Sequence, residues 1–462
     1  MAGTKSWLDN LKVRLSYGEV GNDAIDSDLL TQSWTAETNL KYQYALDNKY
    51  QTAYKLANAE MANPNLKWET TITRDLGFDF AVLNSRLSGT IDLYWNTTKD
   101  LLMRTTIPGV TGFASTYANI GQTSNKGVEI SLSGVILNTK DWNLQASMNI
   151  NFNRGKVDKL APSVDGLYGT SWNSSQTFPG KDYILMEGKP VGQVRGFVYD
   201  GFYTVDDFDY VNGTYVLKEG ISDLGSFINT VHEGVSRQRP KGQNAYPGLP
   251  KFIDRDNSGT IDEADATIIG DMTPKHTGGF NITGSYKNID FGAYFNWSYG
   301  NDIYNVNKLA SLNNAKEWGA YENKLSIVKN CFRIYDVRDG ELVALTTPEQ
   351  LKEANVNATL PLPYSQNGIT STLGIEDGSY LRLNTLTVGY TFPKKWMQKA
   401  GINNLRLYGS IYNVFTITSY SGLDPEVNSN TAANKAFYPT VGLDWGTYPR
   451  ARSFVIGLNL NL

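Results

Sequence analysis

Apolar and polar residues alternate along many segments of this chain, and the longest unbroken example covers residues 142–153. Because a β-strand places successive side chains on opposite faces, this pattern predicts a strand with one apolar face and one polar face. A strand of a soluble sandwich is about 5 to 6 residues long, whereas a tilted strand that crosses a bilayer needs about 9 to 11. The length of this segment therefore favours a membrane-spanning strand.

The same alternation recurs along the chain. One of the repeats changes phase, because Leu383 occupies one face and Leu386 the other, which predicts a bulge near Asn384 and Thr385. In all, the pattern predicts ten strands, at residues 11–17, 76–82, 91–95, 128–136, 142–153, 280–286, 289–299, 380–392, 405–415 and 454–462.

Short and long connections alternate between these strands. Short turns on one rim and long loops on the other are typical of an outer-membrane barrel, in which the turns are periplasmic and the loops extracellular. The predicted fold class is therefore all-β, an antiparallel transmembrane β-barrel with long extracellular loops. The short connections are expected at residues 84–85, 138–141, 287–288 and 393–404, and the long ones at roughly 19–69, 103–119, 157–276, 300–379 and 416–451.

Two short helices are expected within the connections. One covers residues 347–354, where Thr347 caps the helix and Pro348 lies in its first turn. The other covers residues 393–401.

Composition agrees with a β-protein, since the 462 residues include 28 Tyr, 10 Trp and 18 Phe. Many of these rings lie near strand ends, which indicates aromatic girdles at the two membrane surfaces. The alternative is the ordinary preference of aromatic residues for strands. The formal charge of -4 and the lack of a Lys/Arg run argue against nucleic acid as a partner. No apolar run approaches the about 18 residues of a membrane helix, but β-barrels cross bilayers without such runs.

Few residues of the chain suit catalysis. Cys331 is the only cysteine, which excludes an internal disulfide and a cysteine-based zinc cluster. His232 and His276 are the only histidines, and neither lies in a nucleophile or zinc motif. His276 is expected to border the start of a strand. We therefore do not predict an enzyme.

Residues 254–265 match the spacing of a calcium-binding loop. Oxygen donors occur at positions 1, 3, 5, 9 and 12, a backbone carbonyl is expected at position 7, and Gly259 supplies the sharp turn at position 6. The alternative is an acidic turn that binds no metal. If the loop binds Ca²⁺, the ion is structural, and its ligands come from Asp254, Asp256, Ser258, Thr260, Asp262 and Asp265.

Several segments resemble the SusC/RagA family of TonB-dependent outer-membrane transporters. They follow the family's order over essentially the whole chain, and the extreme C-terminus resembles an outer-membrane assembly signal, although it ends in Leu462 rather than an aromatic residue. The segments are residues 65–70 (NLKWET), 93–102, 119–129 (NIGQTSNKGVE), 376–383 (EDGSYLRL), 389–393, 413–415 and 420–426.

The resemblance implies a fold and a set of partners. Family members have barrels of about 22 strands with a plugged lumen, so residues 1–462 are expected to be the C-terminal portion of such a barrel, with the plug and the N-terminal barrel strands absent. The first ten residues also lack the features of a signal peptide. The chain is then a fragment, a truncated gene product or one piece of a split protein.

The implied function is import of oligosaccharides, or of peptides, across the bacterial outer membrane. The implied partners are outer-membrane lipid, a SusD-like surface lipoprotein that covers the loops, and the TonB complex, which acts through the absent plug. Loop aromatic residues are expected either to stack on a substrate or to pack the loops together. These are Trp172, Tyr199, Phe202, Tyr203, Trp318 and Tyr321.

A second hypothesis is a secreted, β-rich carbohydrate-binding or adhesion protein that carries the calcium loop. In that case the apolar faces of the strands enclose an internal core, and the chain is soluble without detergent. Loop shape and the partner are expected to determine the substrate.

Overall fold

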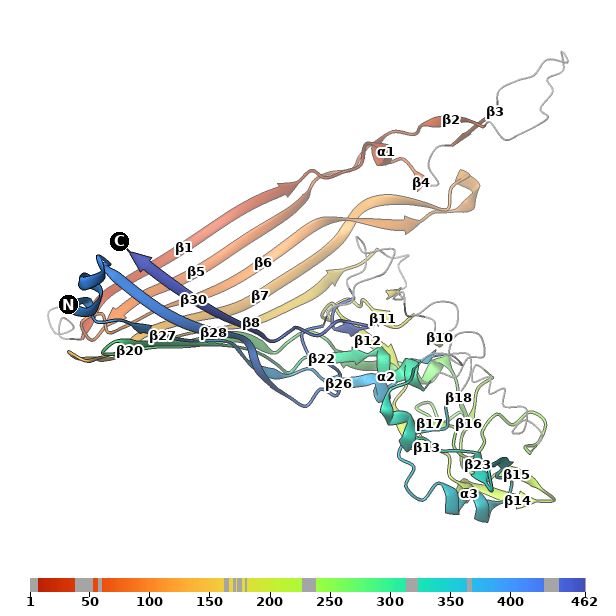
Figure 1. Cartoon of the computed structure of the whole chain (residues 1–462). Helices are drawn as coiled ribbons and strands as arrows, with labels where there is room; N and C mark the ends of the chain where they lie inside the picture. Colours follow the sequence, from red (N-terminus) through yellow and green to blue (C-terminus); the bar gives the residue numbers. More distant parts are fainter. Residues whose placement is uncertain are drawn as a thin grey trace.

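The computed structural model describes residues 7–37, 53–56, 60–161, 166–168, 172, 177–178, 181–226, 238–312, 323–363, 368–427 and 440–461. Ten long strands form one antiparallel sheet, in which neighbours in the sequence of long strands are also neighbours in space (Figure 1). Their order is β1 (Leu8–Asn22), β5 (Glu69–Val82), β6 (Leu87–Thr106), β7 (Ser115–Asn138), β8 (Trp142–Lys159), β20 (His276–Tyr286), β21 (Ile289–Tyr299), β27 (Tyr380–Thr391), β28 (Asn404–Thr418) and β30 (Ser453–Asn461).

The strand register gives the whole sheet one apolar face and one polar face. A row of cross-strand neighbours on the apolar face consists of Leu15, Leu76, Leu93, Val128 and Phe152. A row on the polar face consists of Lys12, Asp79, Thr90, Ser131, Asn149, Gly279, Asn296 and Arg382.

None of the residues that the structure describes covers the apolar face. Leu15 near one edge of the sheet is 81% exposed, and Ile456 near the other edge is 83% exposed. A soluble protein rarely leaves so large an apolar surface bare. The alternating residues therefore face an external apolar phase and not an internal core.

The connections differ between the two ends of the sheet. Both termini and the short turns lie at one end, and the long loops gather at the other (Figure 1). The short turns cover residues 83–86, 139–141, 287–288 and 392–403, which confirms the predicted positions of the short connections.

One predicted loop is shorter than expected. The sequence pattern placed a long connection at residues 103–119, but β6 runs on to Thr106 and β7 begins at Ser115. These two residues pair with each other. The ladder thus continues beyond the apolar part of the strands, where the side chains no longer alternate cleanly, and only residues 107–114 connect the two strands.

Smaller sequence features are confirmed. The register shifts between Leu383 and Thr385, where the bulge was expected. The helix α3 (Pro348–Ala354) is capped by Thr347, whose side chain accepts from the backbone of Gln350. The second predicted helical piece consists of α4 (Lys394–Met397) and a 3-10 turn at Gln398–Ala400. No helix among the described residues is long and apolar enough to cross a membrane.

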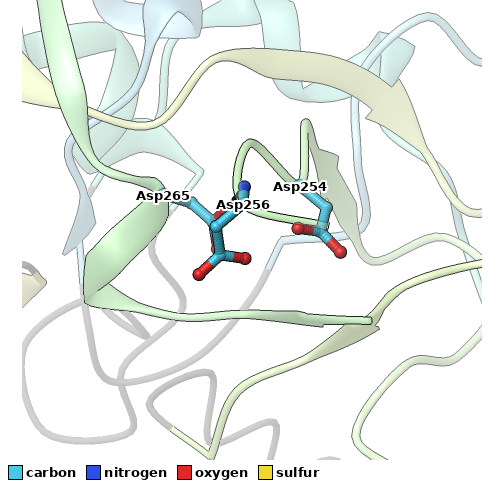
Figure 2. Close-up of side chains that lie close together, drawn as sticks. All are labelled: Asp254, Asp256 and Asp265. Carbon is cyan, nitrogen blue, oxygen red and sulfur yellow. Dashed lines mark hydrogen bonds between the residues drawn. The ribbon is translucent and has the colours of Figure 1, made fainter. Parts of the chain in front are cut away.

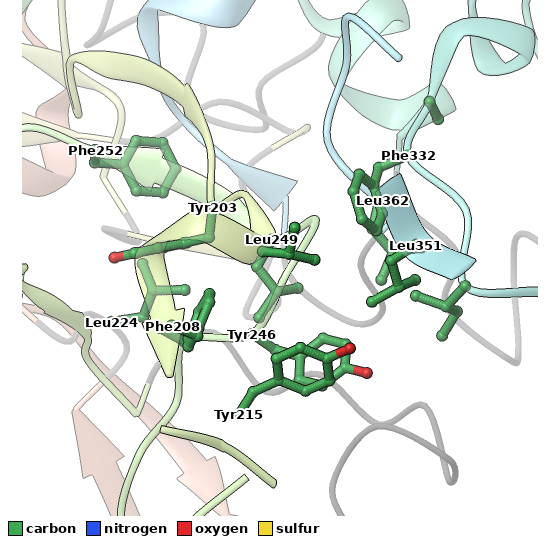
Figure 3. Packing of buried hydrophobic residues seen from close by; sticks show 14 of the residues in the cluster. Tyr203, Phe208, Tyr215, Leu224, Tyr246, Leu249, Phe252, Phe332, Leu351 and Leu362 are labelled. Carbon is green, nitrogen blue, oxygen red and sulfur yellow. The ribbon is translucent and has the colours of Figure 1, made fainter. Parts of the chain in front are cut away.

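Most of the buried apolar residues lie in the loops, in two clusters. The larger cluster packs residues of β13 (Tyr199–Phe202), β15 (Thr214–Leu217), β17 (Pro250–Phe252) and α3 against one another (Figure 3). The smaller cluster joins β12 (Gln193–Gly196), β22 (Asp302–Asn305) and α2 (Val306–Ser311) with β29 (Leu443–Asp444). The loops therefore form a folded region with its own core at one end of the sheet.

Candidate functional site

A hollow of about 670 Å³ lies against β5, β6, β7, β8, β20 and β21, and on β5 and β6 it lies close to the short turn that joins them. Hydroxyl and amide groups of the polar face line it, including those of Thr90, Ser131, Asn149 and Asn281. The side-chain oxygen of Asn149 already accepts from the backbone N–H of Gly279 at 2.7 Å. Such groups both donate and accept hydrogen bonds, so this wall suits ligands rich in hydroxyl or amide groups.

An ion network crosses three strands at the β1 edge of the polar face. The guanidinium of Arg14 on β1 donates to Asp79 on β5 at 3.0 Å and to Asp92 on β6 at 2.7 Å. It passes over Gly77, where an added Cβ would lie 2.6 Å from both Arg14 and Asp92. The glycine on the middle strand therefore makes room for the ion pair between the outer two.

The same arrangement occurs on the polar face near the opposite edge of the sheet. The guanidinium of Arg406 on β28 passes over Gly389 on β27 and donates to Asp290 on β21, from Nε at 2.9 Å. In the middle of the sheet, the Tyr94 hydroxyl on β6 passes over Gly127 on β7 and donates to Asn153 on β8 at 3.0 Å. Each of these side chains therefore links two strands across the strand that lies between them.

A buried ion cluster ties the last loop to the wall. Arg382 on β27 is only 1% exposed, and its guanidinium lies 2.5 Å from Asp424 and 2.9 Å from Glu426. Arg450 lies 3.1 Å from the same Glu426 carboxylate. Because a buried guanidinium that loses its carboxylate is costly, this cluster fixes where the loop between β28 and β30 leaves the sheet.

The predicted calcium loop brings three carboxylates together. One oxygen each of Asp254, Asp256 and Asp265 lies within 4.8 Å of the others, and Figure 2 shows the three side chains. Asp265 is fully buried and accepts from the backbone N–H of Arg255 at 2.6 Å. The Ser222 hydroxyl donates to Asp254 at 2.7 Å.

Hydrogen bonds also determine the electrostatics of this loop. The bond from Ser222, assisted by backbone N–H groups including that of Gly259, lowers the pKa of Asp254 below its ordinary value. The loop thus brings the carboxylate of Asp254 close to two others, and oxygen ligands of this kind suit a hard divalent cation. Asp262 caps the following 3-10 turn by accepting from Ala264, and the Thr260 carbonyl accepts from the Ser258 hydroxyl at 2.9 Å.

The predicted aromatic residues have different surroundings. Tyr203 is fully buried, and its hydroxyl donates to the Ser222 carbonyl at 2.6 Å. Trp172 is 9% exposed and donates to the Tyr304 hydroxyl at 3.1 Å. Both rings thus contact protein, which was the alternative role considered for them.

Tyr199 and Phe202 are partly exposed at the margin of the larger cluster. Burial raises the pKa of Tyr199 to about 12, so its hydroxyl stays neutral at ordinary pH. For these two residues, contact with substrate stays a prediction. Trp318 and Tyr321 lie outside the described residues.

The sequence pattern did not single out the charged pairs of the polar face or two loop aromatic residues. Trp445 is 38% exposed and stacks obliquely on Trp172, and Tyr448 is 89% exposed. Their positions in the aromatic, glycine-rich segment 438–449 are the only sequence signal for them. The partners of Arg14 and Arg406 are far apart in sequence, so their pairing follows only from the register.

The two-faced sheet and the loop region agree with what comparison with known proteins finds. The family model described as "TonB dependent receptor-like, beta-barrel" matches residues 5–414. The chain belongs to this family. It is a family of outer-membrane receptors and not of enzymes, so the expected fold class and the location in the bacterial outer membrane are confirmed.

Curated relatives align with nearly the whole chain. TonB-dependent receptor P3 of Formosa agariphila is 32% identical over 451 residues, which cover 97% of this chain and 39% of that receptor. TonB-dependent receptor SusC of Bacteroides thetaiotaomicron is 29% identical over 456 residues, which cover 98% of this chain and 38% of SusC. The chain thus spans about two fifths of the length of these relatives.

A solved structure also matches. The chain resembles a chain of the RagAB peptide transporter with a TM-score of 0.66 and 25% identity, over 98% of this chain and 41% of that one. The recognised resemblance to the SusC/RagA group of TonB-dependent receptors is therefore confirmed. In this TonB-dependent barrel, the apolar face contacts lipid and the polar face lines the lumen.

Proposed function

We propose that this chain supplies part of the wall and of the extracellular loops of a TonB-dependent importer of oligosaccharides or peptides. The main support is the polar face, where hydroxyl and amide groups line a hollow while the opposite face of the same strands is bare and apolar. Similarity to the RagAB peptide transporter supports peptides as one substrate class, and the hydroxyl and amide groups of the wall suit oligosaccharides as the other.

The proposal includes further parts of the transporter. Ten strands are fewer than the about 22 of a plugged transporter barrel, and residues 1–462 align with about two fifths of each relative. We therefore propose that these residues are the C-terminal portion of the barrel and work with additional strands and a plug that contacts the TonB complex. We also propose that a SusD-like lipoprotein covers the folded loops, and that the partly exposed Tyr199 and Phe202 and the exposed Tyr448 line the entrance beneath it.

Uptake by living cells tests the function. Cells with the intact gene and cells in which it is deleted are given labelled oligosaccharides and labelled peptides in separate experiments. We expect the deletion to abolish uptake of one of the two classes, and a protonophore to abolish it in the intact cells, since TonB action requires the proton gradient. Unchanged uptake of both classes in the deletion strain would contradict the proposal.

We also propose that the loop at residues 254–265 binds Ca²⁺ and that the ion stabilises the loop region. Asp256→Asn should weaken calcium binding at least tenfold, because it removes the charge of one carboxylate ligand from a hard-cation site. Isothermal titration of the purified intact protein measures the affinity. Asp209→Asn, an exposed carboxylate on a different hairpin, serves as the control, and equal calcium affinity in both variants would contradict the proposal.

A further inference from the structure

A row of cationic and aromatic side chains crosses five neighbouring strands on the lipid-facing side of the sheet, just on the loop side of an apolar row. The apolar row marks the end of the hydrophobic band. Its members, which pair directly across β1, β5, β6, β7 and β8, are Leu15, Leu76, Leu93, Val128 and Phe152. Two residues further toward the loops on each strand, the side chains on the same face are Tyr17, Arg74, Trp95, Lys126 and Arg154.

The position of this row along the membrane normal follows from β8. Its lipid-facing residues from Trp142 to Phe152 are all apolar, and Arg154 is the next residue on that face. Ten residue steps of about 3.3 Å, tilted by about 40°, give a height of about 25 Å. This is the usual height of the apolar band of an outer-membrane barrel, so Arg154 and its row lie at the level of the lipid headgroups on the loop side.

The three cations are available for an external anion. In the part of the chain that the structure describes, Arg74, Lys126 and Arg154 form no ion pair with a carboxylate. The Arg74 guanidinium lies 6.0 Å from the Tyr17 ring centre, and one Arg154 nitrogen donates to the Pro274 carbonyl at 2.8 Å. Lys126 and Arg154 are exposed.

The carboxylates nearest along this face have other partners. Glu19, the next residue of β1 on this face, accepts from the Tyr17 hydroxyl. Asp158, on the same face of β8, forms an ion pair with Lys156 at 3.0 Å. The row itself therefore carries three positive charges and no negative one, across strands about 4.8 Å apart.

We propose that this cationic row binds the phosphate groups of a lipid in the outer leaflet, with the acyl chains of that lipid on the apolar band below. Cations near an anionic membrane surface each contribute to binding, and Arg and Lys pair directly with phosphate. Tyr17 and Trp95, which are 66% and 45% exposed, have the amphipathic rings that favour the headgroup level. The proposal needs the outer-membrane location but not the import function.

Lipid binding by the intact protein tests the row. The protein is exchanged into nanodiscs of phosphatidylcholine that contain either bisphosphorylated lipid A or its dephosphorylated form, and native mass spectrometry measures the lipid that stays bound. The triple variant R74Q/K126Q/R154Q should bind the phosphorylated form about 100-fold more weakly, since each of the three cations contributes about fivefold and the three factors multiply. The dephosphorylated form should bind weakly to both proteins.

The control removes three charges from the other rim. K140Q, K287Q and K394Q together lie at the short turns, and this variant should keep full binding. Should the triple variant fold poorly, K126Q alone changes one exposed lysine and should weaken binding about fivefold. Equal binding of phosphorylated lipid A by the wild type and the row variants would overturn the proposal. Binding of inorganic phosphate as tight as that of phosphorylated lipid A would also overturn it, as would retention of an acidic protein in place of the lipid.

Discussion

Single residues set the close approaches within the barrel wall. Gly127 illustrates this, because an added Cβ would lie 2.5 Å from the backbone carbonyl oxygen of Phe152 on the next strand and 2.4 Å from the Tyr94 hydroxyl. The sequence pattern predicted the face on which such residues lie, since the alternation has a period of two. It did not predict which side chains cross over a glycine, because Tyr94 and Asn153 meet only through the register of three strands.

Replacing Gly127 should therefore destabilise the wall. Gly127→Ala should lower the free energy of unfolding by about 1–3 kcal/mol, because the backbone oxygen that faces the new methyl group cannot move aside without shifting β8. Urea titration of the intact protein in detergent measures the change. Gly134→Ala on the same strand is the matched control, because its nearest neighbour would lie at 3.6 Å, and an equally large loss there would contradict the explanation.

Secondary-structure elements differ in how well the sequence predicted them. The long strands, the bulge near Asn384 and the capped helix α3 were predicted, because each carries a local signal of alternation or capping. The small loop strands were not predicted, because they are only two to five residues long and many of them pair across long sequence separations. Tyr304 of β22, for example, pairs with Leu443 of β29.

Glu376 of β26 (Ile375–Asp377) joins two of these loops. It accepts from the backbone N–H and the hydroxyl of Ser421, each at 2.9 Å, and from Lys308 at 3.1 Å. Burial alone would raise the pKa of Glu376, but these hydrogen bonds and the Lys308 charge outweigh burial and lower the pKa below 4.5. The ionised form therefore stabilises the fold above about pH 4.5, and this contribution is lost as the pH falls through the lowered pKa.

Glu376→Gln should remove this pH-dependent contribution. At pH 7 the variant should be less stable than wild type by about 1–2 kcal/mol, since bonds to a charged acceptor are stronger than bonds to a neutral one. As the pH falls well below 4.5 the difference should vanish, which thermal unfolding at several pH values measures. Glu341→Gln, at an exposed site in another hairpin, should match wild type throughout. A Glu376→Gln deficit that is the same at every pH would argue against the ionised form as its cause.

At the scale of the whole molecule, two opposite faces of one sheet and one folded loop region account for the architecture. The alternation along residues 142–153 predicted β8, which begins at Trp142 as expected and runs on to Lys159. It also predicted that an external apolar phase covers Met148 and Ile150. The sequence did not reveal that the loops have their own cores, because loop residues such as Tyr203 and Tyr246 carry no periodic signal. Burial there depends on contacts between distant segments.

The central claim is that lipid covers the apolar face of this sheet while water reaches the polar face. Spin labels on single cysteines along β8, in a Cys331→Ala background of the intact protein in its membrane, test it most directly. At positions 148 and 150 we expect high accessibility to oxygen, which dissolves in lipid, and low accessibility to a water-soluble nickel chelate. At positions 149 and 151 oxygen accessibility should be low. Equal accessibilities at the four positions, or higher nickel accessibility at 148 and 150 than at 149 and 151, would contradict the account.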